Sequence, residues 1–114
     1  MTVERLTETD RDVVRQCLVA LRAGRYLDDD NIVSRVGVAP ATYDALIAAW
    51  PRIDDSRDDS EACLVVNNAL NEVCHGVDIP DREWPRWFTV SRDELRAVYG
   101  RWAGLRGWDR TGIR

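Results

Sequence analysis

A single histidine and three cysteines limit the chemistry that the side chains of this 114-residue chain can support. His75 would have to serve any Ser-His-Asp or Cys-His arrangement, and it directly follows Cys74 in a segment with helical periodicity. Neighbouring residues on a helix point about 100° apart, so this pair does not form a catalytic dyad by itself. Zinc sites with several histidine ligands are excluded. We therefore expect no catalytic residues, and we interpret His75 as a surface residue near a helix C-terminus.

The cysteines fit neither a disulfide framework nor a metal site. Cys63 and Cys74 fall on one predicted helix, about 16 Å apart along its axis, whereas a disulfide needs Cα atoms within about 7 Å of each other. Cys17 lies on an apolar stripe and is expected in the core. An odd number of cysteines without ligand spacing favours a reducing compartment, so we expect a cytoplasmic protein with no metal and no cofactor.

The acidic run at residues 54–59, DDSRDD, is the remaining candidate for a cation site. Aligned with a calcium-binding loop that starts at Asp54, it places oxygen atoms at the first four ligand positions. However, Asp59 stands where the loop needs glycine, and Val65 stands where it needs a bidentate glutamate. We interpret the run as a solvated loop that caps the following helix.

Three asparagines form a polar band on that helix. Asn67 with Asn71, and Asn68 with Glu72, have the i, i+4 spacing that puts both members of a pair on one helix face. Asparagine is a poor residue inside a helix, so three of them need compensation. One interpretation is a buried or interfacial amide network that fixes packing or a partner. The other is a small polar ligand site.

The elements that must position these residues are helices, because apolar residues recur at helical spacing and no segment reads as a strand. Thr7 with Asp10 resembles a capping box, and Ser91 with Glu94 forms a second one. Gly76 suits a left-handed position just past a helix end. Residues 77–90 read as a loop interrupted by proline. The predicted helices span residues 8–23, 30–36, 40–50, 59–75 and 91–105.

These elements predict an all-α fold, a single compact bundle of four to five helices. We expect one domain over residues 1–106 and a frayed C-terminal tail over residues 107–114. A chain of this length buries roughly two thirds of its unfolded surface, so a core is possible. No apolar run reaches the ~20 residues of a membrane span and no secretory leader opens the chain, so we expect no membrane association.

The segment 32–46, IVSRVGVAPATYDAL, resembles a helix-turn-helix of DNA-binding proteins, with Gly37 in the turn. The resemblance implies a helix-turn-helix-like corner, with residues 40–49 as the recognition helix and Thr42 and Tyr43 as possible DNA contacts. The segment departs from the pattern because its second helix offers no Arg, Asn or Gln to read bases. Val33 also replaces the usual small residue of the first helix.

The formal net charge of −4 hides an asymmetry. Residues 1–40 carry six Arg and seven acids, residues 41–81 two Arg and nine acids, and residues 82–114 eight Arg and four acids, which gives −1, −7 and +4. The acidic block and the basic, Trp-bearing end can attract each other within one molecule or between molecules. If nucleic acid is bound, the basic end supplies further possible contacts, Arg101 and Arg106.

Trp50-Pro51, the acidic loop after it and the segment 66–71, VNNALN, together resemble a group of small helical proteins of GC-rich actinobacteria. The resemblance covers most of the chain and implies no activity and no functional residue.

We expect a non-enzymatic helical protein-interaction module that self-associates, because Trp and Arg are enriched where interfaces bind most strongly. The alternative is a helix-turn-helix DNA-binding transcriptional regulator, and a small metal or polar-ligand binder is the weaker one. The expected interaction residues are Trp84, Trp87, Arg92, Arg96, Trp102, Asn67, Asn68 and Asn71.

Overall fold

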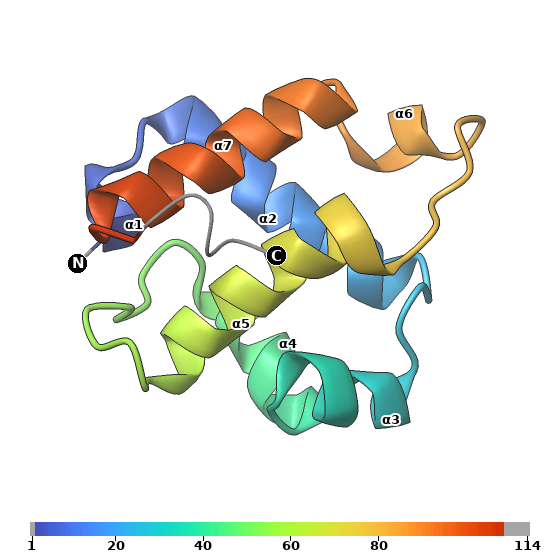
Figure 1. Ribbon diagram of the computed structural model, residues 1–114. Helices are drawn as coiled ribbons and strands as arrows, with labels where there is room; N and C mark the ends of the chain where they lie inside the picture. The colour runs from blue at the N-terminus through green and yellow to red at the C-terminus, as the bar shows by residue number, and fades with distance from the viewer. Residues whose placement is uncertain (1, 109–114) are drawn as a thin grey trace.

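Helix α2, Glu8–Ala23, is the central helix of the protein. The computed structural model describes residues 2–108, and every regular element within them is helical, which confirms the all-α prediction. The Thr7 hydroxyl accepts a hydrogen bond of 3.1 Å from the Asp10 backbone N–H and so caps α2 as expected. Figure 1 shows α2 in the middle of the molecule, between α7 and α4. It packs against α4 (Pro40–Ala49), α5 (Glu61–Asn71), α6 (Trp84–Trp87) and α7 (Arg92–Leu105).

A sharp helical corner joins α2 to the rest of the bundle. Helix α3, Asp29–Asn31, continues into a π-helical turn, η1, Ile32–Val36. Gly37 ends this turn in the left-handed conformation, with φ of 95°, which glycine adopts without a steric penalty. The combined helix Asp29–Val36 and α4 are bent by 81° relative to each other. The predicted helical corner is therefore present. The π-helical turn at the end of its first helix was not predicted.

Helix α5 begins two residues later than predicted, because Ser60 is its N-cap. The Ser60 hydroxyl accepts a hydrogen bond of 3.1 Å from the Cys63 backbone N–H, so the acidic run before it does not cap the helix. After Asn71 the chain widens into a second π-helical turn, η2, Glu72–Gly76.

The expected left-handed conformation of Gly76 is wrong. Gly76 is the last residue of η2, and its φ is not among the positive values in the described part of the chain. An added Cβ at this position would lie 2.6 Å from the Glu72 carboxylate, which Arg35 holds in an ion pair of 3.0 Å. Position 76 therefore favours glycine because a Cβ would collide with the Glu72 side chain, and not because the backbone has a positive φ.

Two short helices were not predicted. Helix α1, Thr2–Arg5, packs against α7, and both lie at the left of Figure 1. Helix α6, Trp84–Trp87, lies in the segment that the sequence assigned to a loop; its second residue, Pro85, fits a first helical turn. Helix α7 starts after its predicted cap, Ser91, whose hydroxyl accepts a hydrogen bond of 3.1 Å from the Glu94 backbone N–H.

Two residues of the predicted C-terminal tail are described by the structure. Gly107 and Trp108, assigned to the frayed tail, still pack on the domain. The Trp108 backbone N–H donates to the Ala103 carbonyl at 3.0 Å, and its ring lies edge-on to Trp102 with centroids 5.3 Å apart. The rest of the predicted tail, residues 109–114, lies outside the described residues.

One apolar core fills the space between the helices, and Trp102 and Tyr43 are its largest fully buried side chains. Within residues 2–108, no single helix is both long and apolar enough to cross a membrane. The one pair of helices that meets these criteria jointly is the bent corner of Asp29–Val36 and α4.

Candidate interaction surface

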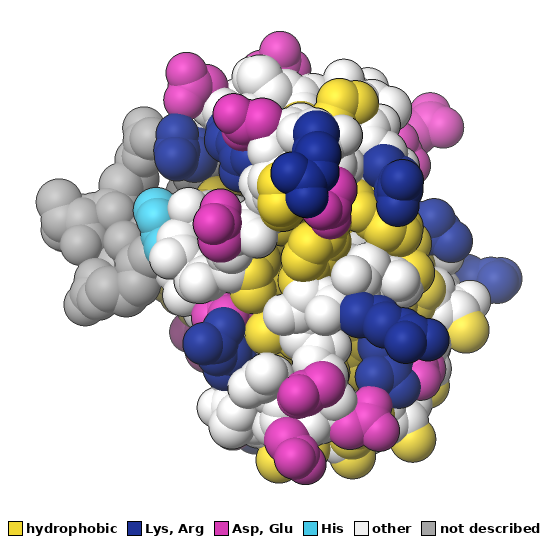
Figure 2. Space-filling model, turned by 90° about the vertical axis from the view of Figure 1, so that its right-hand side faces the viewer, with side chains coloured by type: hydrophobic (Ala, Val, Ile, Leu, Met, Phe, Trp, Pro, Cys, Tyr) yellow, Lys and Arg dark blue, Asp and Glu magenta, His cyan; other side chains and the backbone are white. Residues whose placement is uncertain are grey.

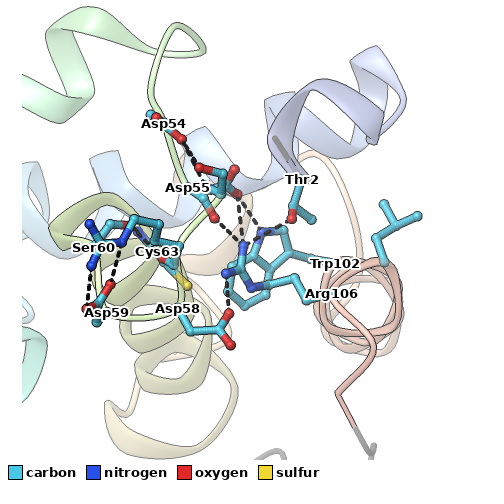
Figure 3. Close-up of polar contacts among 12 residues, drawn as sticks. Thr2, Asp54, Asp55, Asp58, Asp59, Ser60, Cys63, Trp102 and Arg106 are labelled. Carbon is cyan, nitrogen blue, oxygen red and sulfur yellow. Dashed lines mark hydrogen bonds and ion pairs between the residues drawn. The ribbon is translucent and has the colours of Figure 1, made fainter.

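A buried carboxylate joins three distant segments at one end of the bundle. Asp55, in the loop between α4 and α5, is completely buried. Its carboxylate accepts hydrogen bonds from the Val3 backbone N–H at 3.3 Å and from the Trp102 indole N–H at 3.2 Å. It also forms an ion pair of 3.8 Å with Arg106 (Figure 3). A carboxylate buried among donors of this kind tethers the N-terminus and the loop to α7.

The partner cation, Arg106, is itself internal, with a side chain only 3% exposed. Its guanidinium donates to the backbone carbonyl of Asp55, to the Asp58 carboxylate and, at 3.0 Å, to the Thr2 hydroxyl. It also lies 5.3 and 5.2 Å from the ring centroids of Trp102 and Trp108. Two predicted site residues are therefore structural: Arg106 is not free to contact DNA, and the fully buried Trp102 is not free to contact a partner.

A second ion pair connects α2 to α7. Arg101 donates two hydrogen bonds, of 2.7 and 3.0 Å, to the carboxylate of Asp10, which is buried. These hydrogen bonds raise the pKa of Arg101. Arg101, predicted as a possible DNA contact, thus already has an internal anionic partner. The pairs of Arg106 with Asp55 and Asp58 show that the acidic and basic regions of the chain attract each other within one molecule, whereas Asp10 lies outside the acidic region.

The asparagine band is an internal network that connects three helical elements. The Tyr99 hydroxyl donates to Asn67 Oδ1 at 2.6 Å, and the Asn67 amide donates to Asn68 Oδ1 at 3.2 Å. The Asn68 amide in turn donates to the Val36 carbonyl at 2.8 Å. Asn71 contributes a buried Oδ1 for which the described residues provide no hydrogen-bond donor. This arrangement corresponds to the amide network, one of the two interpretations drawn from the sequence.

The inner aromatic layer of α6 belongs to the core. Trp84 is 9% exposed, stacks on Phe88 with ring centroids 4.1 Å apart, and donates from its indole N–H to the Val90 carbonyl at 2.8 Å. Arg92 lies over the Trp84 ring at 4.3 Å and forms an ion pair of 2.9 Å with Asp81. The predicted interaction residues Trp84 and Arg92 thus face each other rather than a partner.

Arg96 is the exposed member of the predicted interaction set. About half of its side chain is exposed, and it forms an ion pair of 2.9 Å with Asp93 one turn earlier on α7. Pairs of this kind on a helix surface are weak and do not prevent other contacts.

The outer layer of α6 forms an exposed aromatic and basic surface. The indole N–H of the half-buried Trp87 donates to the Tyr26 hydroxyl at 3.1 Å, and this hydroxyl donates to Glu83 at 2.5 Å. The two rings meet edge to face, with centroids 6.5 Å apart. Burial and the Glu83 acceptor raise the pKa of Tyr26, so the hydroxyl keeps its proton. We define the α6 surface as Tyr26, Arg82, Pro85, Arg86 and Trp87.

A hollow lined by both acidic and basic residues lies at the turn that follows Tyr26 of the α6 surface. It has a volume of about 550 Å³ and is bounded by Arg22, Arg25, Leu27 and the acidic turn, which we define as Asp28–Asp30. Arg22 is occupied here, because it pairs with Asp29 at 2.6 Å and with Asp44 at 2.9 Å. Figure 2 shows the side of the molecule on which α6 and α3 lie: apolar side chains lie between Arg side chains, and acidic side chains lie towards both the upper and the lower edge.

The helical corner presents a surface poor in polar groups. Tyr43 is completely buried, and its hydroxyl donates to the Leu18 carbonyl at 2.7 Å, so it is not a DNA contact. Thr42 is half-buried. The exposed residues of α4 are three alanines and one acid that Arg22 pairs: Ala41, Ala45, Ala48 and Asp44.

The remaining reactive side chains are the cysteines, the histidine and the carboxylates of the described residues. Within the described residues, no group of three His, Cys, Asp or Glu side chains is arranged to hold a metal ion. Cys17 is buried as expected, and burial raises the pKa of Cys63 and Cys74 to about 11. Thiols of this kind stay protonated at neutral pH and are poor nucleophiles.

Two important residues were not found from the sequence. Asp55 has acidic neighbours in a loop without periodicity, so nothing distinguishes the buried carboxylate from the solvated ones. Tyr26 lies in the turn between two helices, where the helical spacing that identifies core residues no longer applies. Comparisons with protein families, curated protein sequences and solved structures find no match to this chain.

Proposed function

We propose that the protein is a non-enzymatic helical interaction module that associates with copies of itself. The observation that carries the proposal is the α6 surface, where the exposed Arg82, Pro85 and Arg86 accompany the half-buried Trp87. Aromatic residues and arginine are the residue types most enriched in protein interfaces. This surface fits such a role better than it fits a small-molecule site.

The internal pairing of three arginines of the basic end supports the proposal. Arg92, Arg101 and Arg106 each have a carboxylate partner within the chain. Arg82 has only a distant one, Glu83 at 3.9 Å, and Arg86 has no ion pair in the described part of the chain. Arg82 and Arg86 therefore leave charge for an external partner next to Trp87 in the sequence, as the exposed Arg15, Arg25 and Arg52 do elsewhere in the described chain.

Light scattering coupled to size-exclusion chromatography tests the proposal. We expect a mass above the 13.0 kDa of one chain as the protein concentration rises from micromolar to millimolar. Added salt should lower the association, because exposed charges are screened within about 10 Å at 0.1 M ionic strength. A mass of one chain at every concentration and at low salt would refute self-association.

DNA binding is the second candidate, because the corner of Asp29–Val36 and α4, bent by 81°, has the form of a helix-turn-helix. The exposed side chains of α4 provide no base-reading group, so binding would rely on phosphate contacts from exposed arginines. A fluorescence titration with mixed duplex DNA decides between the candidates. Salt-dependent binding at low ionic strength would favour the regulator, and its absence would favour the interaction module.

We also propose that the protein acts in the cytoplasm. Cys17, Cys63 and Cys74 are free thiols, and two of them are buried. A chain with unpaired cysteines is suited to a reducing compartment. Fractionation of cells that produce the protein, followed by detection of the chain in each fraction, tests this location.

A further inference from the structure

We propose that the α6 surface docks against the acidic turn of a second copy, and that the reciprocal contact forms at the same time across a twofold axis. This inference rests on the proposed self-association and names the surface that performs it. Both patches lie on the face shown in Figure 2, with the acidic turn towards its lower edge. A face that carries both members of a complementary pair can bind its own copy.

The basic side of the contact is available for an external partner. The Arg82 side chain is 85% exposed, and its ion pair with Glu83 spans 3.9 Å, at the limit of such contacts. Arg86 is exposed on α6 and has no ion pair among the described residues. Trp87 directly follows Arg86 on α6 and is held in place by its hydrogen bond to Tyr26. A fixed aromatic ring flanked by cations is suited to an acidic surface.

The acidic side of the contact is also available. Asp28 is used by the chain itself, because it accepts a hydrogen bond of 2.8 Å from the Asn31 backbone N–H. Asp29 pairs with Arg22, yet its side chain remains 72% exposed. Asp30 is exposed and has no ion pair in the described residues. The hollow of about 550 Å³ beside this turn provides space for a side chain of the partner.

The chain turns sharply between the two patches. Arg25, the residue between Gly24 and Tyr26, has a left-handed backbone with φ of 59°, which is uncommon for a residue with a side chain. This turn brings Tyr26 of the α6 surface and the acidic turn, two residues further along the chain, onto one face. When a twofold axis passes through that face, each contact between a basic and an acidic patch occurs twice in the dimer. The binding free energies of individually weak surface ion pairs then add up.

Charge reversals on each side test the proposal. R86E changes the basic side and D30R changes the acidic side. R15E and E61R are matched controls, because they reverse exposed charges outside the face, and Glu61, like Asp30, lies in the first turn of a helix. We expect R86E and D30R each to raise the Kd of self-association about tenfold, since each reversal acts on both sides of the axis. The controls should change the Kd by less than about threefold.

The double variant R86E/D30R and a mixture of the two single variants sharpen the test. Both restore opposite charges across the axis, so both should recover the wild-type Kd and a mass of twice 13.0 kDa. Circular dichroism checks that each variant is folded. The inference is overturned if R86E weakens association no more than R15E does, if the double variant stays weak, or if the mass rises beyond two chains. In each of those cases the wild-type association itself still stands, whereas a monomeric wild-type chain overturns the proposed function as well.

Discussion

Removal of the Asp55 carboxylate is expected to destabilise the protein strongly. In Asp55→Ala, the Arg106 guanidinium stays buried and keeps only the exposed Asp58 as a carboxylate partner, and the Val3 N–H and the Trp102 indole N–H lose their acceptor. Breaking a buried ion pair on one side costs about 3–5 kcal/mol. This loss is a large part of the about 5–15 kcal/mol by which small domains are stable.

Urea unfolding followed by far-UV circular dichroism measures the effect. With a slope of roughly 2 kcal/mol per molar urea, a loss of about 4 kcal/mol lowers the midpoint by about 2 M. Asp59→Ala is the matched control, because Asp59 belongs to the same acidic run but forms an exposed ion pair with Arg57. We expect it to change stability by less than about 0.5 kcal/mol.

A double-mutant cycle identifies the source of the loss. Replacing both members of a buried pair by apolar groups is much less costly than removing one, so D55A/R106M should be more stable than D55A. If D55A is unfolded in buffer, the comparison can be made in trimethylamine oxide, which favours the folded state. A midpoint of D55A equal to that of D59A would refute the role assigned to the buried carboxylate.

Further predictions concern the network, two glycines and the thiols. Asn68→Ala leaves the Val36 carbonyl without its donor and should lower the unfolding free energy by about 1–3 kcal/mol in urea titrations; an effect no larger than that of the exposed Ser34→Ala would contradict the network. Gly37→Ala should destabilise by about 1 kcal/mol or more, because of its φ of 95° and the Leu64 side chain 2.9 Å from an added Cβ. In contrast, Gly104→Ala, with open space in α7, should raise the melting temperature through a gain of about 0.5–1 kcal/mol. Burial raises the pKa of Cys63 and Cys74 from 9.0 to about 11, so the folded state binds more protons than the unfolded one between these values, and stability should fall as the pH rises through them. The C63A/C74A variant should show a flatter decline, and an equal slope would argue against this origin.

The longer helices were predictable from the sequence because their physical signals are local. The apolar stripe of α2 and the capping residues Thr7, Ser91 and Gly37 each act within a few residues of the chain. Helix α6 has four residues, too few for a period to be visible. The π-helical turns η1 and η2 span five residues each, and the sequence carries no separate signal for them.

The sites were less predictable because their partners are distant in the sequence. The charge asymmetry between the acidic and basic regions is visible in the composition, but the pairing of Arg101 with Asp10 is set by the packing of α7 on α2. Trp and Arg were expected at an interface on the basis of residue type alone. In the structure Trp102 is completely buried, whereas Trp87 is half-buried. Only the packing of the helices determines this difference in burial.

The position of Asp55 in the chain also constrains the order in which the protein can fold during synthesis. Its carboxylate is satisfied by a residue near the N-terminus and by two residues of the last helical segment, Trp102 and Arg106. Until those two residues have left the ribosome, a chain that buries this loop would enclose an unpaired charge, which is unfavourable. The six α-helices before α7 therefore stay loosely associated until α7 is complete, and chains that stop before residue 102 should be recognised by proteases as unfolded.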